Sequence, residues 1–188
     1  MDLDHLIKKK NVIKNIIKVC NKMRCNKKNL ILLNQIHSNK FHLINDTKRL
    51  KNRKKRFLGD ALITNCRRVA LGILTADCAP IFVYDSKLKI ISAIHSGWKG
   101  SLKGITEKVL DFLIKNGSKK NNLKVVIGPC IAQSKYEVKI DFYNKFIKNN
   151  KNNKIFFKIN KKKIYFNLPQ FISYQIKKKG VRNIELIK

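Results

Sequence analysis

Apolar residues recur at helical spacing between residues 4 and 24, and lysine or asparagine fills most of the positions between them. This pattern predicts an amphipathic helix. Similar spacing predicts helices over residues 101–115 and 140–148 and a last helix after Pro169. The other apolar runs are short, rich in β-branched and aromatic residues, and bounded by turn residues, which is typical of strands. These predicted strands are residues 30–36, 41–44, 60–64, 69–75, 80–84, 88–95, 123–127, 155–159, 163–166 and 184–187.

The order of these elements decides the fold class. Most strands follow one another directly instead of alternating with helices, which favours an α+β architecture over a doubly wound parallel sheet. Residues 85–87 and 160–162 are predicted hairpin turns, and residues 48–56 a solvated basic loop. No internal repeat or interdomain linker interrupts the chain. We therefore predict one domain over residues 1–188, in which mixed β-sheets pack together with flanking helices.

Composition places this domain among ordinary globular proteins. A chain of 188 residues with 44% hydrophobic content can bury a core without disulfide bonds. No apolar run approaches the roughly 18 residues that a membrane-spanning helix needs, and the N-terminus does not resemble a secretory signal. The five cysteines form an odd set without framework spacing, which suits a reducing compartment. We expect a cytoplasmic protein, monomeric or homodimeric, with no membrane association.

The formal net charge of +32 would ordinarily indicate a nucleic-acid partner or an anionic surface. However, the basic residues are 36 lysines and only 7 arginines, whereas recognition of base edges favours arginine. Lysine, asparagine and isoleucine, which all have A/T-rich codons, make up 83 of the 188 residues. We therefore attribute the charge to genome composition and do not expect a nucleic-acid partner, although the charge favours capture of anionic ligands.

Three segments place a histidine or cysteine where an apolar strand ends. These segments are Gln35-Ile36-His37-Ser38, Thr75-Ala76-Asp77-Cys78-Ala79-Pro80 and Ala93-Ile94-His95-Ser96-Gly97-Trp98-Lys99-Gly100. Taken singly, a histidine at the end of a strand is more often a hydrogen-bonded structural residue than a ligand. Cys78 alone would be interpreted as a small side chain that fills space in the core. Together, two imidazoles and one thiolate form a good zinc set, and three protein ligands leave a fourth position for water or substrate. The spacing matches no compact zinc finger.

The turn after His95 suggests a second site. Gly97 and Gly100 allow the backbone to approach a ligand closely, and a following helix would offer free N–H groups. Lys99 adds a positive charge. This turn is a candidate seat for phosphate, although the glycines are equally compatible with a packing role.

At these residues the chain resembles the YfiH-type family, which is also described as multicopper polyphenol oxidase or laccase. The family pattern is Gln-x-His, Thr-Ala-Asp-Cys-x-Pro and His-x-Gly-Trp-x-Gly, and all three segments occur here in the same order. Supporting matches are residues 59–64, Gly128-Pro129 with Tyr136-Glu137-Val138, and residues 163–168. The resemblance extends from about residue 10 to the end of the chain.

The resemblance implies a purine nucleoside phosphorylase with zinc, rather than copper, on His37, Cys78 and His95. The implied substrates are phosphate with adenosine, inosine, guanosine or S-methyl-5′-thioadenosine, and adenosine deamination is an implied second activity. We take Cys78, His95 and Asp77 as candidate catalytic residues at this site, and our hypothesis is that Asp77 transfers a proton or holds a ligand in place. Substrate or phosphate is then expected at Gly97, Trp98, Lys99 and Gly100.

The chain departs from the family pattern at both ends. A Ser-x-Arg-x-Gly-Gly segment is expected before the first helix, and a Cys-Thr segment with an arginine-rich stretch after the last strand. We therefore expect a domain truncated at both ends, which would lack basic groups that contact phosphate. The alternatives are a copper polyphenol oxidase, a hydrolase with Cys78 as nucleophile and His95 as base, and an inactive homologue or polyanion-binding protein.

Overall fold

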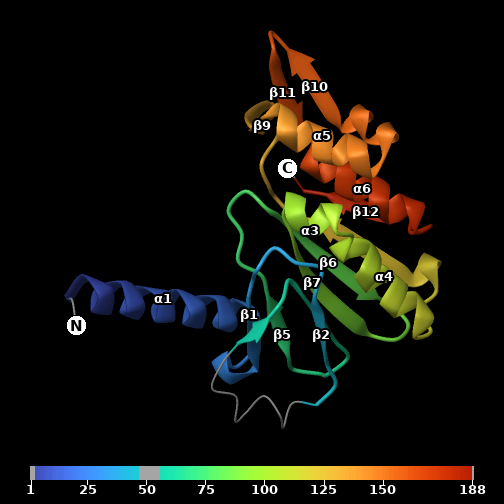
Figure 1. Cartoon of the computed structure of the whole chain (residues 1–188). Helices are drawn as coiled ribbons and strands as arrows, with labels where there is room; N and C mark the ends of the chain where they lie inside the picture. Colours follow the sequence, from blue (N-terminus) through green and yellow to red (C-terminus); the bar gives the residue numbers. More distant parts are fainter. Residues whose placement is uncertain (1–2, 47–55, 188) are drawn as a thin grey trace.

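The computed structural model describes residues 3–46 and 56–187 of the chain. At its centre lies a six-stranded mixed sheet with the strand order β12-β8-β6-β7-β4-β2 (Figure 1). The four middle strands pair antiparallel, whereas β2 and β12 join the two edges in parallel. These strands are β2 (Phe41–Ile44), β4 (Ala61–Thr64), β6 (Ala79–Asp85), β7 (Ile90–Ser96), β8 (Leu123–Ile127) and β12 (Asn183–Leu186).

Helices cover one face of this sheet. These helices are α3 (Trp98–Leu102), α4 (Ile105–Lys115) and α6 (Leu168–Lys178). Alternate residues of β6, such as Ile81 and Val83, pack on this side with Val109 and Ile172 of the helices. Each of these four side chains is at most 2% exposed, so this layer holds the main core.

A smaller parallel sheet covers part of the opposite face, in the order β3-β1-β5. Its strands are β1 (Leu30–Asn34), which follows a 3₁₀ turn at Lys27–Asn29, β3 (Phe57–Leu58) and β5 (Ala70–Gly72). Leu33 and Leu71 of this sheet pack with Leu62 and Ala93 of the central sheet in a second core. The two sheets thus share one apolar interface, and the end of β1 lies close to the central sheet.

A third unit follows in the chain and is held together by aromatic rings. It comprises β9 (Glu137–Val138), α5 (Ile140–Asn149), β10 (Phe157–Asn160) and β11 (Lys163–Phe166), with 3₁₀ turns at Gln133–Lys135 and Lys151–Phe156. The ring centroid of Phe146 lies 4.6 Å from that of Phe166 and 5.2 Å from that of Phe171. Because Phe146 is fully buried, its ring joins this unit to the main core.

Replacing Phe146 with alanine is therefore expected to destabilise the protein strongly. Removing a fully buried phenylalanine ring costs about 3–5 kcal/mol, which is a large part of the roughly 5–15 kcal/mol that stabilises a domain. Urea denaturation of Phe146→Ala measures this loss. Phe82→Ala is the matched control, because Phe82 is 44% exposed. Equal losses in the two variants would contradict this account of the core.

The mixed α+β single domain is confirmed, with differences in detail. The predicted helix over residues 101–115 is two helices, because Gly104 adopts a left-handed conformation (φ 74°) between α3 and α4. The predicted strand over residues 155–159 begins only at Phe157, after a 3₁₀ turn. The two-residue strands β3 and β9 were not predicted. The predicted basic loop over residues 48–56 lies outside the described residues except for Arg56.

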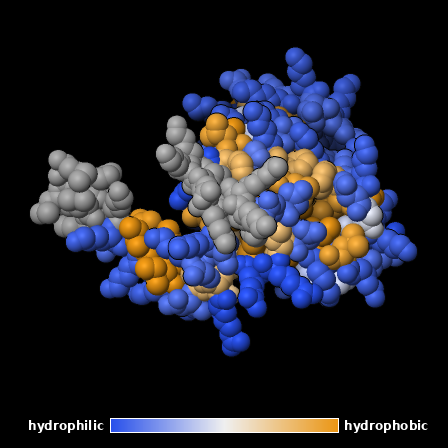
Figure 2. Space-filling view, turned by 90° about the horizontal axis from the view of Figure 1, so that it is seen from below, coloured by the Kyte–Doolittle hydropathy of each residue, from blue (hydrophilic) through white to orange (hydrophobic). Residues whose placement is uncertain are grey.

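The amphipathic helix predicted at the N-terminus is present as α1 (Leu3–Lys22), and it projects from the body of the molecule (Figure 1). Its apolar residues Val12, Ile17 and Val19 are 43–56% exposed, and apolar side chains gather along it in Figure 2. Only near its end does α1 contribute a buried side chain, Cys20, within the described part of the helix. None of the described helices combines the length and apolar character that crossing a bilayer requires.

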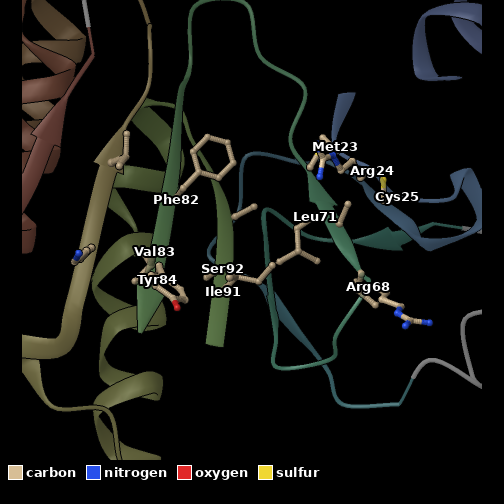
Figure 3. A pocket seen from close by; sticks show the side chains of 15 residues that line it. Met23, Arg24, Cys25, Arg68, Leu71, Phe82, Val83, Tyr84, Ile91 and Ser92 are labelled. Carbon is tan, nitrogen blue, oxygen red and sulfur yellow. The ribbon is translucent and has the colours of Figure 1, made fainter. Parts of the chain in front are cut away.

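A groove of about 490 Å³ lies where α1 ends, on the face of the central sheet opposite the helices (Figure 3). Met23 and Leu71 form one wall, and Phe82 and Ile91 of the sheet form the floor. Its lining is mostly apolar. None of the predicted site residues lines this groove.

Candidate metal centre

The structure brings His37, Cys78 and His95 together. Their ligand atoms all lie within 4.8 Å of one another, and the ring centroids of the two histidines are 4.9 Å apart. Pairing of β6 with β7 sets Pro80 opposite His95, so Cys78, just before β6, lies beside the end of β7. His37 lies in the turn that follows β1 of the small sheet. His95 is 4% exposed, Cys78 is half-buried and His37 is exposed, so the centre opens to solvent on the His37 side.

The carboxylate of Asp60 lies next to His37 and His95 and is fully buried. Its Oδ1 accepts hydrogen bonds from the backbone N–H groups of Ile36 (3.2 Å) and His37 (3.0 Å) and lies 2.9 Å from Nδ1 of His95. Its Oδ2 accepts from the backbone N–H of Ser38 (2.6 Å) and from the Ser38 hydroxyl (2.7 Å). Five polar contacts therefore converge on one side chain.

These contacts determine the charge state of Asp60. Burial by itself raises the pKa of a carboxyl group, but here the hydrogen bonds from Ser38, His95 and His37 outweigh burial and lower the pKa below its ordinary value. Asp60 is therefore an anion at neutral pH. An ionised carboxylate is purely an acceptor, which matches the donors around it.

A second polar contact positions the segment that carries Cys78. The side-chain amide of Gln35 donates to the carbonyl oxygen of Leu74 (2.7 Å) and accepts from its backbone N–H (2.8 Å). In this way Gln35 fastens the segment before β6 to the end of β1. A further backbone hydrogen bond runs from Ile131 N–H to the carbonyl oxygen of Asp77 (3.0 Å). The Cys78 segment is thus held at two points.

Gly97 packs directly against two of the candidate ligands. A Cβ atom at this position would lie 2.5 Å from Sγ of Cys78 and 3.2 Å from Nδ1 of His37. The φ of Gly97 is −80°, an ordinary value for any residue, so the absence of a side chain matters here for space. Gly100 also serves packing, because a Cβ atom there would lie 3.1 Å from the carbonyl oxygen of Ser38. The close packing at both positions explains why neither could carry a side chain without displacing its neighbours.

The other predicted site residues surround this centre less closely. Trp98 is half-buried with its ring 4.9 Å from that of Phe142, and the exposed Lys99 has its Nζ 5.6 Å from the Trp98 ring. Asp77 is exposed. Among the causes that raise the pKa of the Cys78 thiol, burial is the largest, followed by the carboxylates of Asp77 and Asp60.

Sequence reasoning missed Asp60, Cys130 and Tyr136 as neighbours of this centre. Burial and the charges of Cys78 and Asp77 raise the pKa of Tyr136 to about 12, and burial with the charge of Cys78 raises that of Cys130. A usable signal existed only for Asp60, which is an acid at the start of an otherwise apolar strand. Cys130 and Tyr136 lie in an irregular segment whose path the sequence does not determine.

The donor set fits a single metal ion of the zinc type. Imidazole nitrogen and thiolate sulfur are the usual protein ligands of zinc, and three of them form an open site. Because Nδ1 of His95 faces Asp60, Nε2 is the nitrogen of this residue that remains for a metal. Partners of this kind commonly orient metal-binding histidines.

Comparisons with known proteins show what the chain is similar to. The family model described as multi-copper polyphenol oxidoreductase laccase matches residues 5–188. A protein of Rickettsia prowazekii named purine nucleoside phosphorylase is 33% identical over 98% of this chain and 74% of its own length. A Rickettsia conorii protein of the same name is 36% identical over 84% of this chain, which spans 64% of that relative. A prokaryotic protein named adenosine deaminase is 34% identical over 42% of this chain and 30% of its own length.

Solved structures show the same fold. The crystal structure of YfiH from Bacillus licheniformis superposes with a TM-score of 0.84 at 24% identity, covering 93% of this chain and 69% of that one. YlmD from Geobacillus stearothermophilus gives 0.82 at 18% identity, covering 93% and 68%. With a family match over nearly its whole length, this chain belongs to the YfiH family, described as multi-copper polyphenol oxidoreductase laccase.

Proposed function

We propose that this chain is a zinc-dependent purine nucleoside phosphorylase. The observation that carries the proposal is the convergence of His37, Cys78 and His95 on one point that is open to solvent on one side. The names of the two rickettsial relatives support the reaction class. We propose adenosine, inosine, guanosine and S-methyl-5′-thioadenosine as substrates, with adenosine deamination as a second activity that the deaminase-named relative supports.

In phosphorolysis an oxygen of phosphate forms a bond to C1′ of the ribose, and the bond from C1′ to the purine nitrogen breaks. The purine leaves with the bonding electrons and takes up the proton that phosphate gives up, so inosine yields hypoxanthine and ribose 1-phosphate. Zinc held by His37, Cys78 and His95 would supply a Lewis acid at this site. The role left to the chain is to hold the reactants in line and to move this proton.

Particular residues are proposed for these tasks. Asp77 is exposed beside Cys78, where its carboxylate can carry a proton between phosphate and purine. The positively charged Lys99 and the half-buried Trp98 lie on α3, directly after the glycine that touches Cys78 and His37. We assign phosphate and substrate contacts to this segment, Gly97 to Gly100. All of these assignments depend on the metal centre being the place of reaction.

Two enzymatic alternatives fit the site less well. A multicopper oxidase needs several metal sites, whereas within the described residues one group of three ligands comes together. A cysteine hydrolase needs a thiol with a lowered pKa next to a base. Here burial and two carboxylates raise the pKa of Cys78, and no hydrogen bond joins it to His95 in the described structure.

The test is metal analysis together with product detection. We expect about one zinc per chain, and release of hypoxanthine and ribose 1-phosphate from inosine that requires phosphate. Removing the metal with a chelator should abolish release, and added Zn²⁺ should restore it. Zinc-free protein that releases no base, but is retained on DNA in a salt-sensitive manner, would instead support the polyanion-binding alternative.

A further inference from the structure

We propose that Asp60 is a positioning residue that assembles the two histidine ligands before any metal binds. One buried carboxylate fixes both the conformation of the turn that carries His37 and the tautomer of His95. The inference rests on the proposed metal centre, but its central statement concerns the metal-free protein and can be tested there. Asp60 touches neither substrate nor metal in this proposal.

The first part of the argument concerns the proton on His95. A neutral imidazole carries its proton on one nitrogen, and only the other nitrogen can bind a metal. Because both oxygens of Asp60 already accept from N–H or O–H donors, the contact of 2.9 Å between Oδ1 and Nδ1 of His95 places the His95 proton on Nδ1. Nε2 is then free of a proton. The backbone adds a second tie, since His95 N–H donates to the carbonyl oxygen of Asp60 at 2.7 Å.

The second part concerns the turn at His37. This histidine adopts a left-handed conformation (φ 53°), which is unfavourable for a residue with a side chain. This conformation allows the consecutive N–H groups of Ile36, His37 and Ser38 to donate hydrogen bonds to the Asp60 carboxylate. Successive N–H groups arranged in this way form a concave site for an anion. The carboxylate therefore holds the backbone in the conformation in which the His37 ring faces Cys78 and His95.

The two parts together distinguish Asp60 from other neighbours of the centre. The Cys78 segment is held separately, by Gln35 and by a backbone contact from Ile131. Removing the Asp60 charge thus affects both imidazoles at once and leaves the Cys78 segment in place. An asparagine has nearly the same shape but replaces one oxygen by an N–H₂ donor. Whichever of the two positions the N–H₂ group takes, it faces backbone N–H groups. These groups are donors as well, so they cannot accept a hydrogen bond from it.

The experiment compares Asp60→Asn with Asp85→Asn in a Zn²⁺ competition assay against a chromophoric chelator. Asp85 is a matched control, because it is 1% exposed, accepts two backbone hydrogen bonds (2.8 and 2.9 Å), and lies at the other end of β6. We expect Zn²⁺ affinity to fall by about 100-fold in Asp60→Asn, the upper range for such outer partners, and to change less than about 3-fold in Asp85→Asn. Undiminished affinity in a folded Asp60→Asn protein would overturn the proposal.

A measurement on the unmodified protein decides the case if Asp60→Asn does not fold. Nitrogen-15 NMR of the metal-free protein at pH 8 identifies the His95 tautomer, and a His95→Gln variant assigns the signals. We expect the proton on Nδ1, and a proton on Nε2 would overturn the proposal. A wild-type protein that does not bind Zn²⁺ would refute the proposed function, whereas the tautomer would still test the role of Asp60.

Discussion

Gly97→Ala is expected to lose zinc almost completely while remaining folded. The added methyl carbon would lie 2.5 Å from Sγ of Cys78, whereas non-bonded heavy atoms are normally separated by about 3.5–4.0 Å. Either the sulfur or the backbone must therefore move by roughly 1 Å, far beyond the ~0.2 Å within which metal–ligand distances are held. Because the same methyl group would crowd Nδ1 of His37, two ligands are displaced together. We expect Zn²⁺ affinity to fall by more than about 100-fold, the upper range for outer-partner losses.

The matched control for this variant is Gly117→Ala. Gly117 has a positive φ (98°), so alanine costs stability there, but its Cβ atom would meet only Leu88 at 3.9 Å. We expect Gly117→Ala to be destabilised by about 1 kcal/mol and to bind Zn²⁺ like the wild type. Zinc content and denaturation midpoint, measured on both variants, separate the two effects. Normal zinc binding by Gly97→Ala would show that the ligand geometry described here is wrong.

The elements predicted best from the sequence are those whose stability is local or follows from strand periodicity. The alternating pattern of β6 and β7 and the turn at Asp85 determine this hairpin, because the Asp85 carboxylate accepts from the N–H groups of Lys87 and Leu88. These two strands also bring Cys78 beside His95. Half of the candidate centre therefore follows from one hairpin that sequence reasoning can find.

The remaining features depend on contacts between residues far apart in the chain. The strand predicted to extend to Ile36 ends at Asn34, since the next residues turn around the Asp60 carboxylate. Asp60 and His95 are 35 positions apart in the sequence, and no local sequence pattern predicts their contact. The helix α1 shows the opposite case. Its apolar periodicity predicts the helical conformation correctly, but the periodicity does not identify what covers its exposed apolar face.

The relation between the metal centre and the reaction is tested most directly by Cys78→Ser. The hydroxyl keeps nearly the size of the thiol, so packing against Gly97 is preserved, but serine is not among the usual ligands of zinc. Zinc sites of four ligands contribute apparent binding energies of about 10–16 kcal/mol, so losing the thiolate should cost roughly 3 kcal/mol, or more than ~100-fold in affinity. At micromolar protein without added metal, we expect the purified variant to carry little zinc.

If phosphorolysis takes place at this centre, Cys78→Ser should lose phosphate-dependent release of hypoxanthine in proportion to its zinc content. Cys66→Ala is the matched control, since its half-buried thiol faces the carbonyl oxygen of Ile44 (3.6 Å), away from the three ligands. That variant should keep both zinc and activity. Full activity in zinc-free Cys78→Ser would place the reaction elsewhere on the molecule. Loss of zinc and activity together, with the same denaturation midpoint as the metal-free wild type, would make the His37–Cys78–His95 centre the site of phosphorolysis.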